Sequence, residues 1–398
     1  MINTLIADVL GDDSGAAERA TAALVELGTE AARPIIAAIE GDQSRARSPL
    51  LDVLLAMEDP DLVPWLCDLL ESPHAGLRIA AFELLGSLGD ESVVEPLTNA
   101  LNDKNRWTRQ CMAANALGRS GRAEAIEPLL DITRTHLPDW RDPAAAVETL
   151  LTTVEEEWEI RPLMLLPQVA VALAQLGRQD LGPVIVHLAA FDSSGTELDD
   201  MDYIRSARDR AVAALSHVTG PGMVGALRKA ASEGNPEIRE SALEGLFYLG
   251  RPESVETLLE YLEDASMTVR HSAMIWFNRI TGQLYEPGET PAKAPRSWWK
   301  MYAKDFHHDV CHRRGQPLVL DALIEELGEQ PNAAPDLIRE IYIISGKDMR
   351  RERRGRRRSF DFFTLAKNWI SSSEAPRLGA GRLYKYGVFC QNPDQGPE

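Results

Sequence analysis

With 398 residues, the chain is long enough for two or three domains or for one long repeat array. A hydrophobic content of 44% excludes wholesale disorder, and only 6% of the residues are aromatic, which favours close helix packing over a β-rich core. The net charge of −19 opposes a general nucleic-acid surface, because such a surface needs clustered Lys and Arg against phosphate.

The N-terminal stretch lacks the basic and apolar segments of a signal peptide, and no apolar run approaches the roughly 18 residues of a membrane helix. Four cysteines, Cys67, Cys111, Cys311 and Cys390, form no CxxC pair. These features predict a cytoplasmic protein with free thiols.

Apolar helical segments end at turns that recur along the chain. The turn anchors are Gly28, Glu58, Gly89, Gly121, Gly177, Gly220, Gly250 and Gly282, and subtraction of their numbers gives gaps of 30, 31, 32, 56, 43, 30 and 32 residues. Gly suits the left-handed conformation that ends a helix. The nearly constant gap predicts stacked helical hairpins, because one hairpin cannot bury its apolar stripe alone.

Two other residue types follow the same period. Proline is expected in the first turn of the second helix of five units, at Pro34, Pro64, Pro96, Pro128 and Pro183. Arginine precedes the anchor by eleven or twelve residues at Arg47, Arg78, Arg109, Arg208, Arg239 and Arg270. These arginines are either a basic ladder for anions or ties from each helix to the adjoining repeat, and the acidic net charge favours ties.

The segment LRIAAFELLGSLGDESVVEPLTNALND, residues 77 to 103, resembles the HEAT-like repeat first described in phycobilisome lyases. This resemblance implies an all-α fold, an α-solenoid of about eight HEAT-like helical hairpins. Its relatives include bilin lyases, scaffold proteins and a metal-dependent hydroxylase, so it implies little about function. A weaker resemblance, carried by Arg313–Arg314–Gly315–Gln316–Pro317 before paired helices, is to bacterial HEAT-repeat proteins associated with type VI secretion.

The pattern divides the chain into four regions. HEAT-like repeats are expected in 1–133 and 200–282, and a degenerate repeat with a helical insertion (143–157) and an acidic one in 134–199. Region 283–398 is predicted to be a divergent helical cap with helices at 317–328 and 335–345. A cap is needed because the last repeat would otherwise expose its apolar face.

Catalytic motifs are scarce. His307, His308, Cys311 and His312 form an HHxxCH cluster that could offer zinc ligands on a helix, although a solvated helix end is the favoured interpretation. No histidine is followed by Glu, which argues against the metal-dependent hydroxylase. There is no GxSxG, P-loop or GxGxxG, and His187 and His217 are expected to be core residues. The sequence therefore predicts no catalytic residue, no cofactor and no metal.

One segment near the C-terminus is strongly basic. Its arginines are Arg350, Arg351, Arg353, Arg354, Arg356, Arg357 and Arg358. They could bind an external anion, fold back onto the acidic repeats or remain solvated. Together with Trp298 and Trp299 they are the candidate partner-binding residues.

The predicted function is a non-catalytic protein-interaction scaffold or adaptor that binds a protein through its concave solenoid face. The finer expectation is an accessory protein of a bacterial assembly or secretion system. The charge balance disfavours nucleic acid as the partner. The alternatives are a polyanion binder acting through residues 350–358 and a lyase-type HEAT-repeat enzyme.

Overall fold

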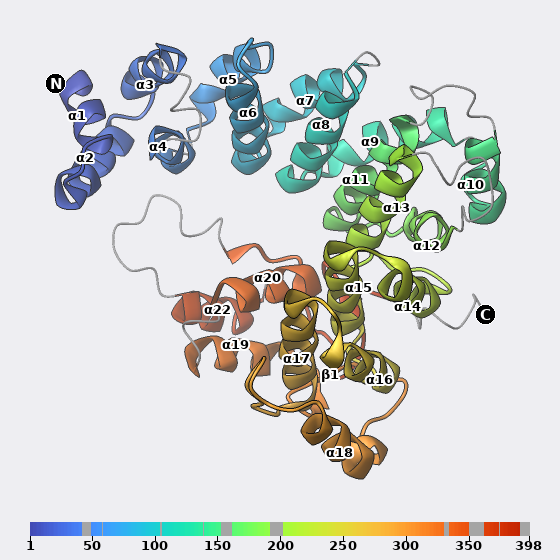
Figure 1. Ribbon diagram of the computed structural model, residues 1–398. Helices are drawn as coiled ribbons and strands as arrows, with labels where there is room; N and C mark the ends of the chain where they lie inside the picture. The colour runs from blue at the N-terminus through green and yellow to red at the C-terminus, as the bar shows by residue number, and fades with distance from the viewer. Residues whose placement is uncertain are drawn as a thin grey trace. The chain divides into compact units, whose positions relative to one another are not determined.

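The computed structural model describes residues 1–41, 49–57, 59–103, 106–137, 139–152, 161–191, 202–329, 334–349, 362–373 and 375–390. The chain forms two compact units, Met1–Ile132 with Asp348–Leu365, and Thr133–Lys347 with Ala366–Glu398. Both are built from helices, which confirms the predicted all-α class (Figure 1). The four-region division proposed above stays a prediction.

The first unit consists of helical hairpins in chain order. Its helices are α1 (Ile2–Val9), α2 (Ser14–Leu27), α3 (Thr29–Gly41), α4 (Pro49–Met57), α5 (Val63–Leu69), α6 (Ala75–Leu88), α7 (Val94–Leu101), α8 (Trp107–Ser120) and the start of α9 (Ile126–His136). Short 3-10 turns, η2 (Pro60–Leu62), η3 (Glu91–Val93) and η4 (Ala123–Ala125), lead into α5, α7 and α9. Helix α8 packs on both α6 and α7, as expected for neighbouring repeats.

The second unit continues the hairpins and adds short strands. Its elements are α10 (Pro143–Thr152), α11 (Arg161–Gln175), α12 (Gly182–Ala190), α13 (Asp202–Ala214), α14 (Met223–Glu233), α15 (Pro236–Leu249), α16 (Pro252–Glu260), η6 (Tyr261–Glu263), α17 (Met267–Thr281), α18 (Lys293–Tyr302), η7 (Ala303–Asp305), β1 (His312–Arg313), β2 (Gln316–Pro317), α19 (Leu320–Glu329), α20 (Ala334–Ser345), the end of α22 (Phe362–Ile370), β3 (Tyr384–Lys385) and β4 (Val388–Phe389). Its core is mostly Leu, Ala, Val and Ile from facing helices.

The predicted turn chemistry is largely confirmed. Gly89, Gly121, Gly250 and Gly282 each follow the last residue of a helix in the left-handed conformation. This conformation costs glycine little, because it has no Cβ. A few helix starts are capped by a side chain, for example that of Asn235, which accepts a hydrogen bond from Ile238 N at 2.9 Å.

Several details differ from the sequence expectation. Gly222, at the start of α14, has the positive φ that was expected of Gly220. Pro34 lies inside α3 rather than in its first turn, because that helix begins at Thr29, directly after the Gly28 turn. The inserted helix predicted at 143–157 is α10, which is described as far as Thr152. Glu58, Trp158 and most of the acidic insertion lie outside the described residues.

The C-terminal region, predicted to be a divergent helical cap, contains short strands as well as helices. Two antiparallel hairpins of two-residue strands, β1–β2 and β3–β4, interrupt the helices. The two turn residues of each hairpin have positive φ, Arg314 with Gly315 and Tyr386 with Gly387. This geometry matches the right-handed twist of the strands.

Each hairpin tip closes the C-terminus of a helix. Arg314 N and Gly315 N donate to the carbonyls of Arg279 and Ile280 near the end of α17, both at 2.8 Å. In the same way, Tyr386 N and Gly387 N donate to Ile343 and Ile344 near the end of α20, at 2.6 and 2.8 Å. The tips thus satisfy carbonyls that would otherwise lack a partner at a helix end.

No helix of the described residues has the length and apolarity that a membrane crossing requires.

The contact between the start of α12 and the loop before α14 leaves no room for a side chain. A Cβ on Gly182 would lie 1.8 Å from the carbonyl oxygen of Thr219. We expect Gly182→Ala to lower the free energy of unfolding by about 2–3 kcal/mol, because backbone must move to relieve this overlap. Urea unfolding followed by circular dichroism measures the change.

The matched control is Gly225→Ala on α14, in the same unit. A Cβ there meets nothing within 4 Å. Its better helix propensity is expected to add about 0.5–1 kcal/mol. Equal effects of the two variants would contradict the close backbone contact.

Candidate functional site

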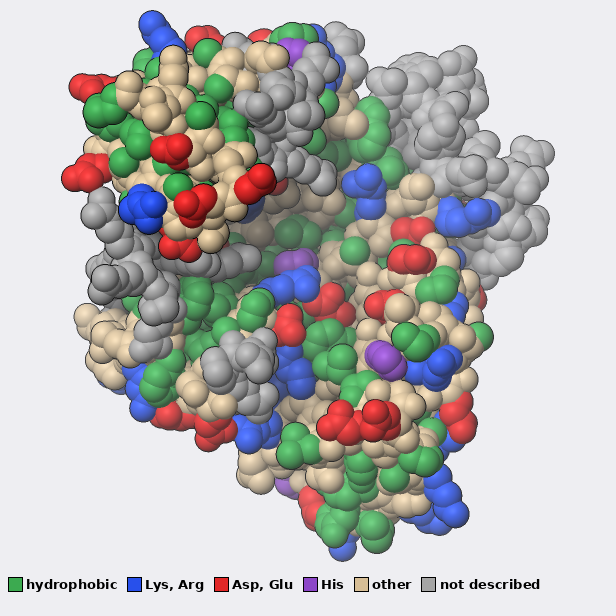
Figure 2. Space-filling model, turned by 60° about the vertical axis from the view of Figure 1, so that its left-hand side comes forward, with side chains coloured by type: hydrophobic (Ala, Val, Ile, Leu, Met, Phe, Trp, Pro, Cys, Tyr) green, Lys and Arg blue, Asp and Glu red, His purple; other side chains and the backbone are tan. Residues whose placement is uncertain are grey.

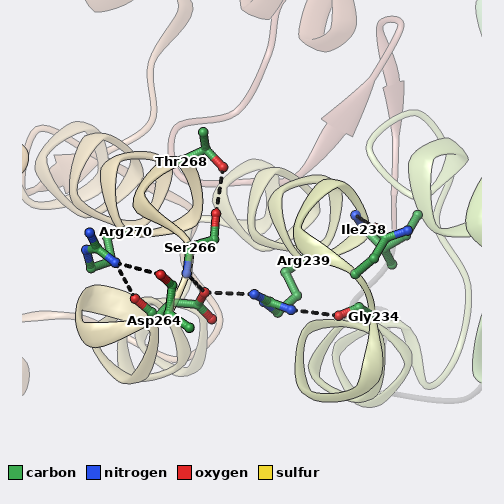
Figure 3. A network of polar contacts seen from close by, with 9 residues as sticks. Gly234, Ile238, Arg239, Asp264, Ser266, Thr268 and Arg270 are labelled. Carbon is green, nitrogen blue, oxygen red and sulfur yellow. Dashed lines mark hydrogen bonds and ion pairs between the residues drawn. The ribbon is translucent and has the colours of Figure 1, made fainter.

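The periodic arginines bind acceptors in loops next to their own helices (Figure 3). On α15, Arg239 donates to Gly234 O and to Asp264 Oδ1, both at 2.8 Å, and Asp264 lies in the loop before α17. On α17, Arg270 donates to Asp264 O at 2.6 Å. Burial raises the pKa of Asp264, but the hydrogen bonds from Arg239 and Ser266 N outweigh it and leave this pKa below its ordinary value.

The other described members of the series make similar contacts. Arg78 donates to Ser72 O at 2.7 Å, Arg109 pairs with Glu71, and Arg208 pairs with Glu233 at 3.0 Å. Arg47 lies outside the described residues. The ladder therefore ties repeat to repeat, as the acidic net charge suggested, and its guanidinium groups are engaged within the chain.

A buried carboxylate joins the first hairpin to two helices. Glu340 of α20 has no exposed surface, and its two oxygens pair with Arg279 of α17 and Arg313 of β1. An isolated buried carboxylate is very costly, and two guanidinium partners offset that cost. We call Arg279, Glu340 and Arg313 the clasp.

Aromatic rings line the clasp. The Arg313 guanidinium lies 4.0 Å from the centroid of the Phe247 ring, and Arg279 lies 4.9 Å from the same centroid. Trp276 stacks on Phe247 with a centroid separation of 4.5 Å. The negative ring faces add cation–π attraction to the two ion pairs.

The second hairpin buries a cation at the equivalent position. Lys385 on β3 is 1% exposed, donates from Nζ to the carbonyl oxygen of Ser216, and lies 4.6 Å from the centroid of the Tyr248 ring. Burial lowers the pKa of Lys385 to about 8. Unlike Arg313, it has a carbonyl and a ring as partners rather than a carboxylate.

The tip of this hairpin also contacts a half-buried histidine. The Tyr386 hydroxyl hydrogen-bonds Nδ1 of His217, which follows α13, and the Gln175 side chain hydrogen-bonds the same tyrosine. Burial, with a smaller contribution from the positive charge of Lys385, lowers the pKa of His217 to about 3. Of the two histidines expected in the core, His217 is thus half-buried and His187 on α12 is exposed.

Two further ionisable groups of this region are buried. Cys311 and Cys390 are free and buried, and burial raises the pKa of both thiols. The hydrogen bond between His217 and Tyr386 and the one from Lys385 to Ser216 O join chain segments that lie far apart in the sequence.

The HHxxCH cluster does not lie on a helix. The 3-10 turn η7 ends at Asp305, His307 and His308 are exposed, and Cys311 and His312 are buried at β1. His308 pairs with Glu253 and so has a raised pKa. Over the described ranges, no three His, Cys, Asp or Glu side chains group in a way that could hold a metal.

The predicted partner-binding residues are spread over different environments. Trp299 is 6% exposed and packs on Phe306 at a centroid distance of 5.0 Å, so it offers little surface. Trp298 is half-buried against Phe277 and Tyr302. Residues 350–358, with all seven candidate arginines, lie outside the described residues.

Sequence reasoning missed the clasp and Lys385. A signal for the hairpins was present, since two short stretches, CHRRGQPL and LYKYGVFC, each place a glycine after a residue that must adopt positive φ. Pairing of Glu340 with Arg279 and Arg313 joins distant segments, and no local pattern records it.

We expect Glu340→Gln to lower the free energy of unfolding by about 3–5 kcal/mol, because it leaves two largely buried guanidinium groups without a countercharge. The control Glu329→Gln makes the same chemical change in an exposed ion pair with Arg314. It is expected to leave stability nearly unchanged. Chemical denaturation of both variants tests this, and equal losses would contradict a special role of the clasp.

The half-buried His217 predicts a pH dependence. Its folded pKa lies below the unfolded value of 6.5, so the unfolded chain binds the extra proton between these values. The contribution of His217 to the free energy of unfolding is therefore fully present above pH 6.5. It falls on acidification by up to about 1.4 kcal/mol per pH unit. Unfolding measured between pH 7 and 5 should show a smaller slope for His217→Gln. The control His187→Gln, at an exposed position, should keep the wild-type slope.

Comparison with known proteins identifies the repeat. The model of HEAT repeats matches residues 33–110 and 63–151, and the model of the PBS lyase HEAT-like repeat matches residues 238–264. No match to a curated protein was found.

Solved structures with some similarity include human deoxyhypusine hydroxylase, at 16% identity over 71% of this chain and 96% of that chain, with a TM-score of 0.24. Two engineered proteins are also similar. One has 17% identity over 94% and 95% of the two chains with a TM-score of 0.29, and the other has 19% over 71% and 96% with a TM-score of 0.22. These TM-scores are too low to carry an argument. The repeat models, together with the stacked helical hairpins, show that the chain is a HEAT-like repeat protein with an all-α solenoid fold.

Proposed function

We propose that the chain is a non-catalytic scaffold that holds a protein partner against its repeats. The observation that carries this proposal is the engagement of its ionisable groups in joining helices. The arginine ladder links successive repeats, and the clasp links α17, α20 and β1. A stack fixed in this way presents a pre-ordered surface, which lowers the entropy cost of binding.

The remaining features are consistent with that role. Lys385 and the two buried cysteines are enclosed, which supports a structural rather than a catalytic use. We place the scaffold in the bacterial cytoplasm, as an accessory to an assembly or secretion system. The support for this finer proposal is the weaker family resemblance around Arg313–Pro317 and the four free cysteines.

To test the proposal, we would immobilise the full chain and identify what it retains from a bacterial lysate, then purify the retained protein and measure complex stoichiometry by sedimentation. We expect one protein that forms a stable complex of defined stoichiometry. A column carrying an unrelated protein of similar negative charge controls for ion exchange.

A second column tests the polyanion alternative. It carries the chain with Arg350, Arg351, Arg353, Arg354, Arg356, Arg357 and Arg358 replaced by Ser. A scaffold retains the same protein on both columns. Nucleic acid retained by the wild type alone, or no specific protein on either column, would reject the scaffold proposal.

A further inference from the structure

Helix α18 and the 3-10 turn η7 that follows it present three lysines on one exposed face. Lys293 and Lys300 are two helical turns apart, and Lys304 continues the same face into η7. All three are exposed. The opposite face, with Pro295 and Trp299, is buried. The helix is therefore attached on one side and open to solvent on the other.

Many other cations of this unit have partners among the described residues, and these lysines do not. Arg239, Arg279, Arg313 and Arg339 pair with carboxylates, as does Arg296 on α18 itself. Within the described part of the chain, the three lysines make no ion pair or hydrogen bond. Three cations left free on this face form a local positive patch on a chain whose net charge is −19.

One exposed apolar side chain lies next to these lysines. Met301, which follows Lys300 on α18, is 60% exposed. Tyr302, which is 43% exposed, packs on Trp298 on the aromatic side of the helix. Figure 2 shows hydrophobic side chains gathered at the lower end of the view, where α18 lies, with Lys and Arg and also Asp and Glu side chains at their edge.

We propose that this surface, Lys293, Lys300, Lys304 and Met301, binds an acidic amphipathic segment of the partner protein. The inference rests on the proposed scaffold function and names the chemistry of one contact. Carboxylates of the segment meet the lysines, and its apolar residues cover Met301. Methionine suits such a surface, because its flexible thioether adapts to different apolar partners.

Charge complementarity favours a protein segment over nucleic acid or a lipid surface. A nucleic acid or an anionic membrane extends well beyond three lysines and would face the negative charge of the rest of the chain. A short acidic segment fits within the patch and avoids most of that repulsion. Without the patch, an acidic peptide would be repelled by a protein of charge −19, so its binding would be informative.

The probe is a fluorescein-labelled synthetic helical peptide with Glu on one face and Leu on the other, titrated with the full chain in a fluorescence anisotropy assay. A scrambled peptide of the same composition is the first control. We expect the ordered peptide to bind at least tenfold more tightly than the scrambled one. A photoreactive group on its apolar face should crosslink to α18.

Matched variants separate local contacts from net charge. Lys293→Gln, Lys300→Gln and Lys304→Gln together should weaken peptide binding about tenfold or more. Arg19→Gln, Arg141→Gln and Arg377→Gln change three exposed cations elsewhere and should leave it unchanged. Met301→Ser should also weaken binding, whereas Met267→Ser, at an exposed position on α17, should not.

Several outcomes would overturn the inference. They are equal weakening by the two triple variants, crosslinks away from α18, and tighter binding of a 20-nucleotide single strand or of phosphatidylserine vesicles than of the peptide. A partner from the lysate that the Lys293, Lys300 and Lys304 variant retains fully would reject this surface while leaving the scaffold proposal standing. Failure of the scaffold proposal itself would give a different result, in which neither the wild type nor any variant retains a specific protein from the lysate.

Discussion

The second unit depends on one carboxylate. Glu340 is fully buried between Arg279 and Arg313, and these three residues come from α20, α17 and β1. Hydrophobic packing alone would allow helices of Leu, Ala and Ile to slide against one another, because such contacts have little directionality. An ion pair in a dry interior has a single favourable geometry, and every displaced arrangement leaves a charge unpaired. The clasp therefore fixes the position of the first hairpin on the end of α17 and against α20, and the aromatic rings of Phe247 and Trp276 pack around it.

The two hairpins solve the same structural problem twice. Each tip donates two backbone N–H groups to the end of a helix that closes with Thr281–Gly282 or Ser345–Gly346, and each buries a cation against an aromatic ring of α15. The two copies differ in the length of the segment that joins the glycine at the helix end to the next tryptophan. Trp298 follows Gly282 by 16 residues (298 − 282), and Trp369 follows Gly346 by 23 (369 − 346). The additional residues fall in the interval that contains the arginine-rich segment, so this segment is an insertion into a repeated unit. The positive charge of the arginine-rich segment is therefore not a feature that the two copies share.

Sequence alone could predict the elements whose signals are local and periodic. Gly250 and Gly282 end helices where expected, and Arg239 and Arg270 tie neighbouring repeats. The similarity between FNRITGQL and IYIISGKD was visible in the sequence, but its cause was not, because the hairpin that each helix end receives lies about 30 residues or more away. Two-residue strands are too short for an alternating pattern. The HHxxCH cluster misled for a related reason, since helical spacing was assumed for residues that turn into β1.

The same construction explains why a helix near the end of the array can serve as a binding surface. Trp298, Trp299 and Phe306 hold one side of α18, and Arg296 anchors it to Glu263 and to Leu259 O. The aromatic side chains and Arg296 thus attach the helix to the rest of the unit. The lysines on the other side of the helix take no part in this attachment. A helix held rigidly by one face loses little entropy when the other face binds. Helix α18 thus has an attached aromatic face and a free basic face, as a docking element requires. The clasp contributes to this arrangement because it fixes the elements to which α18 is attached.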